Sequence, residues 1–267
     1  MLNFAAKTDV GAREGENEDS IGWSEERKIW IVADGMGGHV SGKTASQIAT
    51  SSMLDSEPDK DTETQVVEAH EAIVAAADKD QALSGMGSTI VVAKLADNSA
   101  EISWVGDSRA YLWRGRELSQ ISRDHSFVEL LRAQNLLSEE QIRADSRGNL
   151  VTQSLGLGDP DPSVTEVPLR YGDWILLCSD GLNGELDDTQ IAEILASSEN
   201  VQSAVDELVD AAITSGGRDN TSVIIIEFKD TRGLGLLWRL IDSRWLPYLL
   251  GSLLAVLFAL VLWTGIV

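Results

Sequence analysis

Val32-Ala33-Asp34-Gly35-Met36-Gly37-Gly38-His39 is the stretch on which the interpretation of this chain depends. The apolar run at residues 29–33 is typical of a buried β-strand. One carboxylate follows the strand, and then three glycines within four residues. Hard divalent cations prefer carboxylate and carbonyl oxygens, and glycine leaves space for a phosphate group. The stretch therefore predicts either a metal site or a plain glycine-rich turn in which Asp34 caps the next helix.

Two further aspartates lie beside glycine at the end of an apolar strand. Residues 174–179 lead into Asp180-Gly181, and Asp219 shortly precedes the apolar run at 222–226. If these strand ends converge, the three carboxylates would repel one another unless cations lay between them. Taken singly, each aspartate is explained as a cap or turn residue. The repeated pattern favours a metal site, and oxygen ligands without a histidine or cysteine cluster favour Mg²⁺ or Mn²⁺ over zinc.

Strands and helices alternate along the chain in a way that predicts an α+β fold. Short strands come in antiparallel runs and helices in pairs, which favours helices packed on antiparallel sheets over a doubly wound parallel sheet. The glycine-rich residues 145–161 are expected to form a loop. The expected strands are residues 4–10, 20–23, 29–33, 88–95, 101–105, 110–113, 117–121, 174–178 and 222–228. The expected helices are residues 42–53, 63–83, 127–133, 138–142, 187–196 and 201–214.

The composition limits the partners, the cellular compartment and the domain organisation of the chain. The formal net charge is −22, which argues against nucleic acid as a partner because its phosphates need basic contacts. Cys178 is the only cysteine, so no disulfide framework is expected, in keeping with a reducing compartment. No signal peptide is expected at the N-terminus. No linker divides residues 1–230, which we expect to form one domain.

The C-terminal segment, residues 245–267, carries no charged side chain and is mostly apolar. It is long enough to cross a hydrocarbon core of about 30 Å as a helix, so we expect a transmembrane anchor; a buried core helix is the alternative. Residues 231–244 are expected to be a basic juxtamembrane linker containing Arg232, Arg239 and Arg244. Positive charge on this side predicts that the N-terminal domain lies on the cytoplasmic face of the cell membrane.

An ordered series of short motifs spans residues 8–228 and carries a family resemblance. The motifs are Asn17-Glu18-Asp19, Asp34-Gly35-Met36-Gly37-Gly38-His39, Gly87-Ser88-Thr89, Gly106-Asp107-Ser108-Arg109, Asp124-His125-Ser126, Ser179-Asp180-Gly181-Leu182 and Gly217-Arg218-Asp219-Asn220-Thr221. Each motif is weakly specific, but the set in this order is strongly so. The chain resembles the metal-dependent protein phosphatases of type 2C, in their bacterial branch. The resemblance implies a β-sandwich of two antiparallel sheets flanked by helix pairs, in α-β-β-α order, with two metals at one end.

The resemblance also implies metal-ligand roles. Asp34 would bridge two Mn²⁺ or Mg²⁺ ions, and the Gly35 carbonyl would bind one of them. Asp180 and Asp219 would hold the other ion, and Asp19 would act on the first through water.

Further residues follow from the same resemblance. Glu18 and Asn220 would lie just outside the ligands, and Asp124 would hold a possible third metal. Asp107 and Arg109 are interpreted as structural residues that pair within the strand-loop framework.

Two departures from the family pattern concern phosphate binding and proton donation. Relatives carry a phosphate-binding arginine where this chain has Glu14, and Arg13, one residue earlier, is the candidate to replace it. Met36 stands where eukaryotic relatives have a presumed acid histidine. His39 and His125 remain as candidate proton donors, although each is more simply explained as a structural histidine. Metal-bound water is the other candidate for protonating the leaving group.

The implied reaction is hydrolysis of phosphoserine or phosphothreonine in proteins by metal-activated water. No phosphoenzyme forms, so Cys178 is not expected to be a nucleophile. A Ser/Thr kinase at the same membrane would be the natural opponent of this activity. The alternative is a catalytically weak or inactive module that binds phosphoproteins at the membrane.

Overall fold

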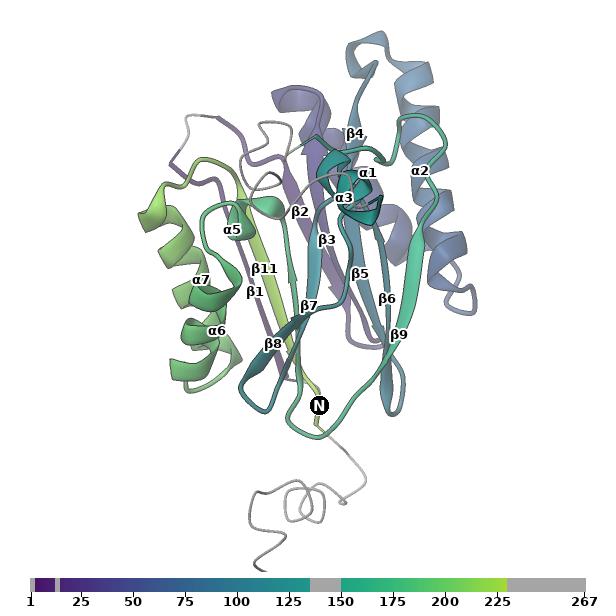
Figure 1. The fold of residues 1–267 in the computed structure, drawn as a ribbon. Helices are drawn as coiled ribbons and strands as arrows, with labels where there is room; N and C mark the ends of the chain where they lie inside the picture. The colour runs from purple at the N-terminus through teal and green to yellow at the C-terminus, as the bar shows by residue number, and fades with distance from the viewer. Residues whose placement is uncertain (1–2, 13–14, 135–149, 230–267) are drawn as a thin grey trace, which may run out of the picture. The chain divides into compact units, whose positions relative to one another are not determined.

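The computed structural model describes residues 3–12, 15–134 and 150–229, and its strands form two antiparallel sheets (Figure 1). The five-stranded sheet has the order β1 (Asn3–Asp9), β11 (Thr221–Glu227), β10 (Trp174–Cys178), β7 (Arg109–Arg114) and β8 (Glu117–Gln120). The six-stranded sheet has the order β2 (Asp19–Ser24), β3 (Ile29–Met36), β5 (Ile90–Leu95), β6 (Ser99–Val105) and β9 (Ser163–Pro168), and β4 (Gly87–Ser88) pairs with β3.

Alternation along the buried strands explains why the two sheets stack on each other. Successive side chains of a strand point to opposite faces of its sheet. In β3, Trp30 and Val32 pack between the sheets, whereas Ile31 packs against helices. In β10, Ile175 joins the layer between the sheets and Leu176 joins the opposite layer. Because both faces of these strands are buried, their sequences are continuous apolar runs and not alternating ones.

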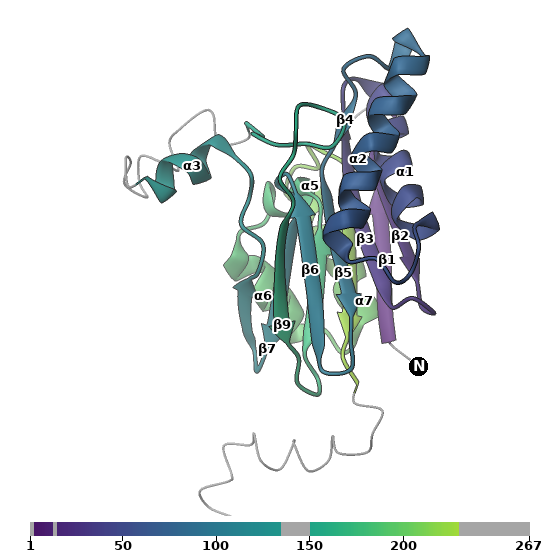
Figure 2. The same ribbon diagram turned by 90° about the vertical axis from the view of Figure 1, so that its right-hand side faces the viewer.

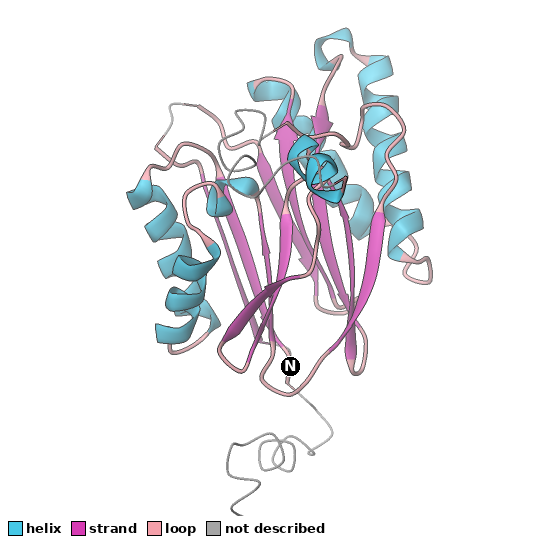
Figure 3. Cartoon of the chain, viewed as in Figure 1, coloured by secondary structure: helices cyan, strands magenta, loops and turns pink. Residues whose placement is uncertain are grey.

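Two helix pairs cover the outer faces of the sandwich, as Figures 2 and 3 show. The pair α1 (His39–Asp55) and α2 (Thr62–Lys79) packs on the six-stranded sheet, and α6 (Asp188–Ser197) and α7 (Val201–Ser215) pack on the five-stranded sheet. Shorter helices are η1 (Gln81–Leu83), α3 (Phe127–Ala133) and α5 (Asp180–Asn183). The result is the predicted α-β-β-α arrangement.

The strand β9 was not predicted from the sequence, and only a loop at residues 145–161 was expected before it. This edge strand pairs with β6, and its residues alternate between half-buried and exposed, so its short polar sequence carries no strong apolar signal. The predicted helix at 138–142 lies outside the described residues. The chain divides into two compact units, Met1–Phe228 and Lys229–Val267. Among the described residues, no helix has the length and apolar character needed to cross a membrane, and the proposed anchor at 245–267 lies beyond them.

Candidate metal centre

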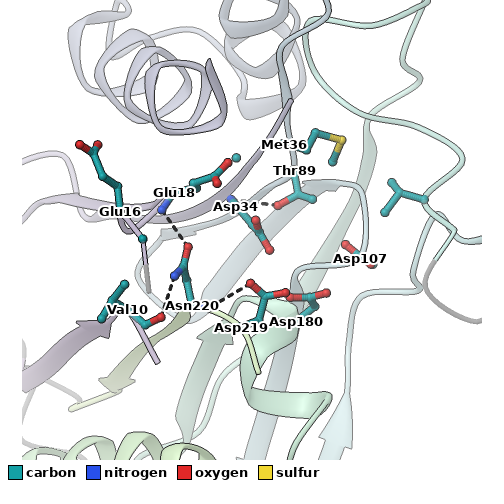
Figure 4. Close-up of a pocket in the computed structure, with 13 residues that line it drawn as sticks. Val10, Glu16, Glu18, Asp34, Met36, Thr89, Asp107, Asp180, Asp219 and Asn220 are labelled. Carbon is teal, nitrogen blue, oxygen red and sulfur yellow. Dashed lines mark hydrogen bonds between the residues drawn. The ribbon is translucent and has the colours of Figure 1, made fainter. Parts of the chain in front are cut away.

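Asp34, Asp180 and Asp219 line one cavity of about 240 Å³, as the strand-end pattern predicts. Asp34 comes from β3 of one sheet, whereas Asp180 follows β10 and Asp219 precedes β11 in the other sheet. Figure 4 shows their carboxylates grouped with that of Asp107. The acidic residues in the lining are Glu16, Glu18, Asp34, Asp107, Asp180 and Asp219. No lysine, arginine or histidine is among the described residues of the lining.

The backbone of Asp34 is fixed by hydrogen bonds that leave its carboxylate out of the strand ladder. Its N–H donates to Thr89 Oγ1 at 3.1 Å, and its carbonyl accepts from the Thr89 N–H at 2.8 Å and from Ser88 Oγ at 3.0 Å. Asp19 lies opposite Asp34 in the β2–β3 register. These contacts use the main chain, so the Asp34 side chain extends into the cavity.

Close approach of backbones at this end of the sandwich requires glycine. A Cβ atom on Gly35 would lie 2.0 Å from the carbonyl oxygen of Gly42 in α1, which is too short for two non-bonded atoms. A Cβ on Gly42 would lie 1.9 Å from Glu18 Oε2. On the other sheet, a Cβ on Gly181 would lie 2.0 Å from the Asn220 carbonyl oxygen. The glycines beside the aspartates thus let strand, helix and the Glu18 side chain meet at the cavity.

Asn220 connects the segments that border the cavity. Its Oδ1 accepts a hydrogen bond from the Glu18 N–H at 2.8 Å, and its Nδ2 donates to the Val10 carbonyl at 2.9 Å. Its own N–H donates to Asp219 Oδ1 at 2.9 Å. The side chain therefore ties the β1–β2 connection to the start of β11, next to Asp219.

Burial and neighbouring carboxylates raise the pKa of three aspartates at this end of the sandwich. Burial, followed by the charges of neighbouring aspartates, raises the pKa of Asp34 well above its ordinary value. Burial also raises the pKa of Asp19 to about 7, although the hydroxyls of Ser222 and Ser179 oppose this, and it raises the pKa of Asp107 to about 7. Such a group is costly to ionise unless cations are present.

The donor set fits hard divalent cations. Asp19 Oδ1 is buried and has no hydrogen-bond partner within the described residues, and the acidic side chains of the cavity lining supply further carboxylate oxygens. Within the described ranges, no three acidic, histidine or cysteine side chains converge tightly enough to form a ready cage for one ion. Mg²⁺ does not require such a cage, because it usually keeps several waters and takes only one or two carboxylates from the protein.

The third-metal candidate Asp124 is ion-paired with Arg109 in this structure, and its role as a metal ligand stays a prediction. Its carboxylate accepts a two-pronged hydrogen bond from Arg109, with Nε to Oδ1 at 2.9 Å and Nη2 to Oδ2 at 2.7 Å, and it does not line the cavity. Asp107, interpreted from sequence as structural, lines the cavity instead. A guanidinium fork matches a carboxylate in shape, which explains why Arg109 holds Asp124. The signal for Asp107 was available, because Gly106-Asp107 directly follows the apolar end of β6.

Of the candidate proton donors and the candidate phosphate ligand, only His125 has a side chain within the described residues. Both ring nitrogens of His125 are in hydrogen bonds, which favours a structural role: its Nδ1 accepts from the Gly106 N–H at 3.3 Å and its Nε2 lies 3.0 Å from Ser163 Oγ. Burial lowers the pKa of His125. The side chain of His39 and all of Arg13 lie outside the described residues.

Cys178 is fully buried in β10, and burial raises the pKa of its thiol to about 12. A buried, protonated thiol is a poor nucleophile. The structure thus supports the expectation that Cys178 is not a nucleophile.

This sandwich with an acidic cavity at the ends of both sheets is the arrangement of the metal-dependent phosphatase class. The chain belongs to the protein phosphatase 2C family, whose family model matches residues 12–215. It is 34% identical over 237 residues to the serine/threonine protein phosphatase PstP of Mycobacterium tuberculosis, covering 86% of this chain and 46% of PstP. It is 35% identical over 236 residues to the serine/threonine phosphatase stp of Listeria monocytogenes, covering 83% of this chain and 94% of stp.

Solved structures agree with these sequence matches. The catalytic domain of PstP in complex with two manganese ions superposes with a TM-score of 0.77 at 33% identity, covering 86% of this chain and 99% of that domain. The chain spans about half the length of full PstP, so the match concerns the catalytic domain and not the whole relative.

Proposed function

We propose that this protein removes phosphate from phosphoserine and phosphothreonine in proteins, using two Mn²⁺ or Mg²⁺ ions. The observation that carries the proposal is the convergence of Asp34, Asp180 and Asp219 from two sheets on one cavity whose described lining has no basic side chain. Relatives of known name support it, since PstP and stp are serine/threonine phosphatases and the PstP domain binds two manganese ions.

We assign the following metal-ligand roles to the residues at the cavity. Asp34 would contact both cations, the Gly35 carbonyl one of them, and Asp180 and Asp219 the other. Asp19, which is buried opposite Asp34 in the β2–β3 register and is not part of the cavity lining, would act through water. Such cations, when bound, lower the pKa of a coordinated water and neutralise phosphate oxygens.

Outside these ligands, Glu18 and Asn220 would hold the cavity wall in place. The Glu18 side chain passes over Gly42, and the Asn220 amide fixes the Glu18 main chain. If a third cation binds, Asp124 would hold it, with its carboxylate oriented by the hydrogen bonds from Arg109.

Two roles in the reaction rest on the sequence alone. Arg13 would bind the substrate phosphate, because a guanidinium can hold two phosphate oxygens at once. His39 would donate a proton to the leaving hydroxyl. Both are tested by substitution: Arg13→Ala is expected to raise KM for a phosphopeptide with little change in kcat, and His39→Asn to lower kcat.

Asn substitutions at the metal ligands test the central proposal. We expect Asp180→Asn and Asp219→Asn each to abolish Mn²⁺-dependent hydrolysis of p-nitrophenyl phosphate and of a phosphothreonine peptide. Asp187→Asn is the matched control, because Asp187 caps α6 away from the cavity and Asn caps equally well. Turnover retained in both ligand variants would refute the metal assignment. A wild-type chain that binds the phosphopeptide but releases no phosphate would favour the alternative, a binding module.

The C-terminal segment gives the proposal its cellular setting. We infer a phosphatase domain at residues 1–230, a basic linker at 231–244 and a single transmembrane helix at 245–267, with the domain on the cytoplasmic face. There its reaction would oppose a Ser/Thr kinase. The support is the uncharged 23-residue run and the preceding arginines. Cell fractionation tests it: the full chain should require detergent for extraction, whereas residues 1–230 should stay in the soluble fraction.

A further inference from the structure

One buried hydrogen bond joins the two sheets at the end where the carboxylates gather. The Ser179 hydroxyl donates to Asp19 Oδ2 at 2.7 Å. Asp19 begins β2 in the six-stranded sheet, whereas Ser179 directly follows β10 in the five-stranded sheet. Ser179 has no exposed surface and Asp19 is 8% exposed, so water does not compete for the bond.

Both ends of this bond adjoin residues of the metal centre. Asp19 lies opposite Asp34 in the β2–β3 register, and Ser179 immediately precedes Asp180. The bond is therefore a direct connection between the sheet that supplies Asp34 and the sheet that supplies Asp180. A change in its length would change the spacing between those two carboxylates.

The direction of the Ser179 hydroxyl is fixed by its other partner. The Ser222 N–H donates to Ser179 Oγ at 2.9 Å, and the Ser179 N–H donates to the Ser222 carbonyl at 3.1 Å. Because the oxygen accepts from Ser222, its single proton is available for Asp19. Ser222 in turn lies in β11, just after Asp219, so the five-stranded sheet holds the hydroxyl from two strands.

Ser179 occupies a helix-capping position, but its side chain does not cap the helix. Ser179 is the N-cap residue of α5, and a serine there ordinarily accepts a hydrogen bond from the first helical turn. No such side-chain bond is present in α5. The hydroxyl serves the contact across the sandwich instead of the helix that it begins.

Hydrogen bonds on the other side of Asp19 complete a closed ring. The Asp19 N–H donates to Asn17 Oδ1 at 3.0 Å, and Asn17 Nδ2 donates to Thr8 Oγ1 at 2.8 Å. Thr8 Oγ1 lies 2.7 Å from Ser222 Oγ. The ring thus returns through β1 to the serine that orients Ser179, and Asp19 is held by main chain and side chain together.

We propose that Ser179 is a positioning residue that keeps Asp34 at a fixed spacing from Asp180 and Asp219 by holding Asp19 across the sandwich. The inference rests on the metal site of the proposed function. Removing the hydroxyl leaves Asp19 Oδ2 without this donor and frees the two sheet ends to move apart. Loss of a residue that orients metal ligands typically weakens metal binding by roughly 10–100-fold.

The test is a Mn²⁺ titration of the full-length chain by isothermal calorimetry, with thermal unfolding measured on the same samples. Ser179→Ala is expected to raise the Kd for Mn²⁺ about tenfold or more. Ser179→Thr keeps the hydroxyl and is expected to restore most of the affinity. Ser103→Ala is the matched control, because Ser103 is equally buried in β6 and its hydroxyl bonds to Thr62, outside the cavity lining.

Distinct outcomes separate the possibilities. A purely structural serine would make Ser179→Ala and Ser103→Ala lower Tm alike, with Mn²⁺ binding unchanged in both, and that result would overturn the inference. If Ser179→Ala does not fold, Ser179→Cys replaces it, since a thiol has similar size but is a weak donor; wild-type affinity in that variant would also overturn the inference. A wild-type chain that binds no Mn²⁺ would instead refute the metal site itself, and wild-type binding without phosphate release would refute only the proposed activity.

Discussion

Replacing Gly35 by alanine tests whether the close contact of β3 with α1 builds the cavity. The new Cβ would lie 2.0 Å from the Gly42 carbonyl oxygen, 2.4 Å from its carbon and 2.8 Å from the Glu18 carbonyl oxygen. All three are backbone atoms, so no side chain can rotate away, and the strand and helix must separate. Forced overpacking of this kind costs about 1–3 kcal/mol. For a domain of this size, 1 kcal/mol corresponds to roughly 2–4 °C in Tm.

Gly22→Ala is the matched control for this substitution. Gly22 lies in the neighbouring strand β2, and like Gly35 it does not have a positive φ. Its Cβ would meet Leu54 Cδ1 at 3.2 Å, which is the movable end of a side chain. Differential scanning calorimetry of the metal-free proteins should show a clearly lower Tm for Gly35→Ala and a change of about 2 °C or less for Gly22→Ala. Equal Tm values for the two variants would refute the packing argument.

Three further outcomes follow from the charges and contacts of the site. In the folded state the pKa of Asp19 and of Asp107 is about 7, whereas the ordinary value is 3.8, so the folded state binds more protons than the unfolded state between these pH values. The stability of the metal-free protein should therefore fall as pH rises from about 4 to 7. Saturating Mn²⁺ should raise Tm more at about pH 8 than at about pH 5. Asp124→Asn should lower stability by about 3 kcal/mol by leaving Arg109 without its anionic partner, and should weaken any Mn²⁺ binding beyond two ions measured by calorimetry. Asp107→Asn should keep Tm in the absence of metal. Cys178 should resist iodoacetamide in the native protein and react only after denaturation, as mass spectrometry would show.

Much of the fold could be predicted because its strongest signals are local. The buried strands of both sheets are continuous apolar runs, and α2 and α7 show helical spacing with Asp61 and Asn200 as their N-caps. The edge strand β9 was not predicted, because an edge strand with one exposed face needs little apolar sequence. Its existence depends on β6 offering a free edge, which is a property of the sheet and not of residues 163–168.

In the candidate site too, some residues have a local sequence signal and others depend on contacts made only in the folded chain. Asp34, Asp180 and Asp219 could be predicted because each follows or precedes a core strand, and antiparallel strands of a sandwich place such ends together. The surroundings of Asp107 and Asp124 could not be predicted, although Gly106-Asp107 directly follows the apolar end of β6. What distinguishes them is Arg109, which lies 15 residues from Asp124 in sequence but binds it with two nitrogens. Only the folded structure shows which carboxylate is already neutralised.

The proposed metal centre, which takes its ligands from both sheets, would also link cation binding to folding. The sheets meet through an apolar layer that includes Trp30 and Ile175, and the like charges of Asp34 and Asp180 oppose that contact at one end. A cation that binds only the folded state adds about 2.7 kcal/mol of stability at 100 times its Kd. Removing a true ligand should therefore cancel the Tm increase that Mn²⁺ produces while leaving the metal-free Tm equal or higher, because one repelling charge is gone. A residue that only supports the fold should lower Tm equally with and without Mn²⁺, so the two Tm values together identify the ligands without any measurement of activity.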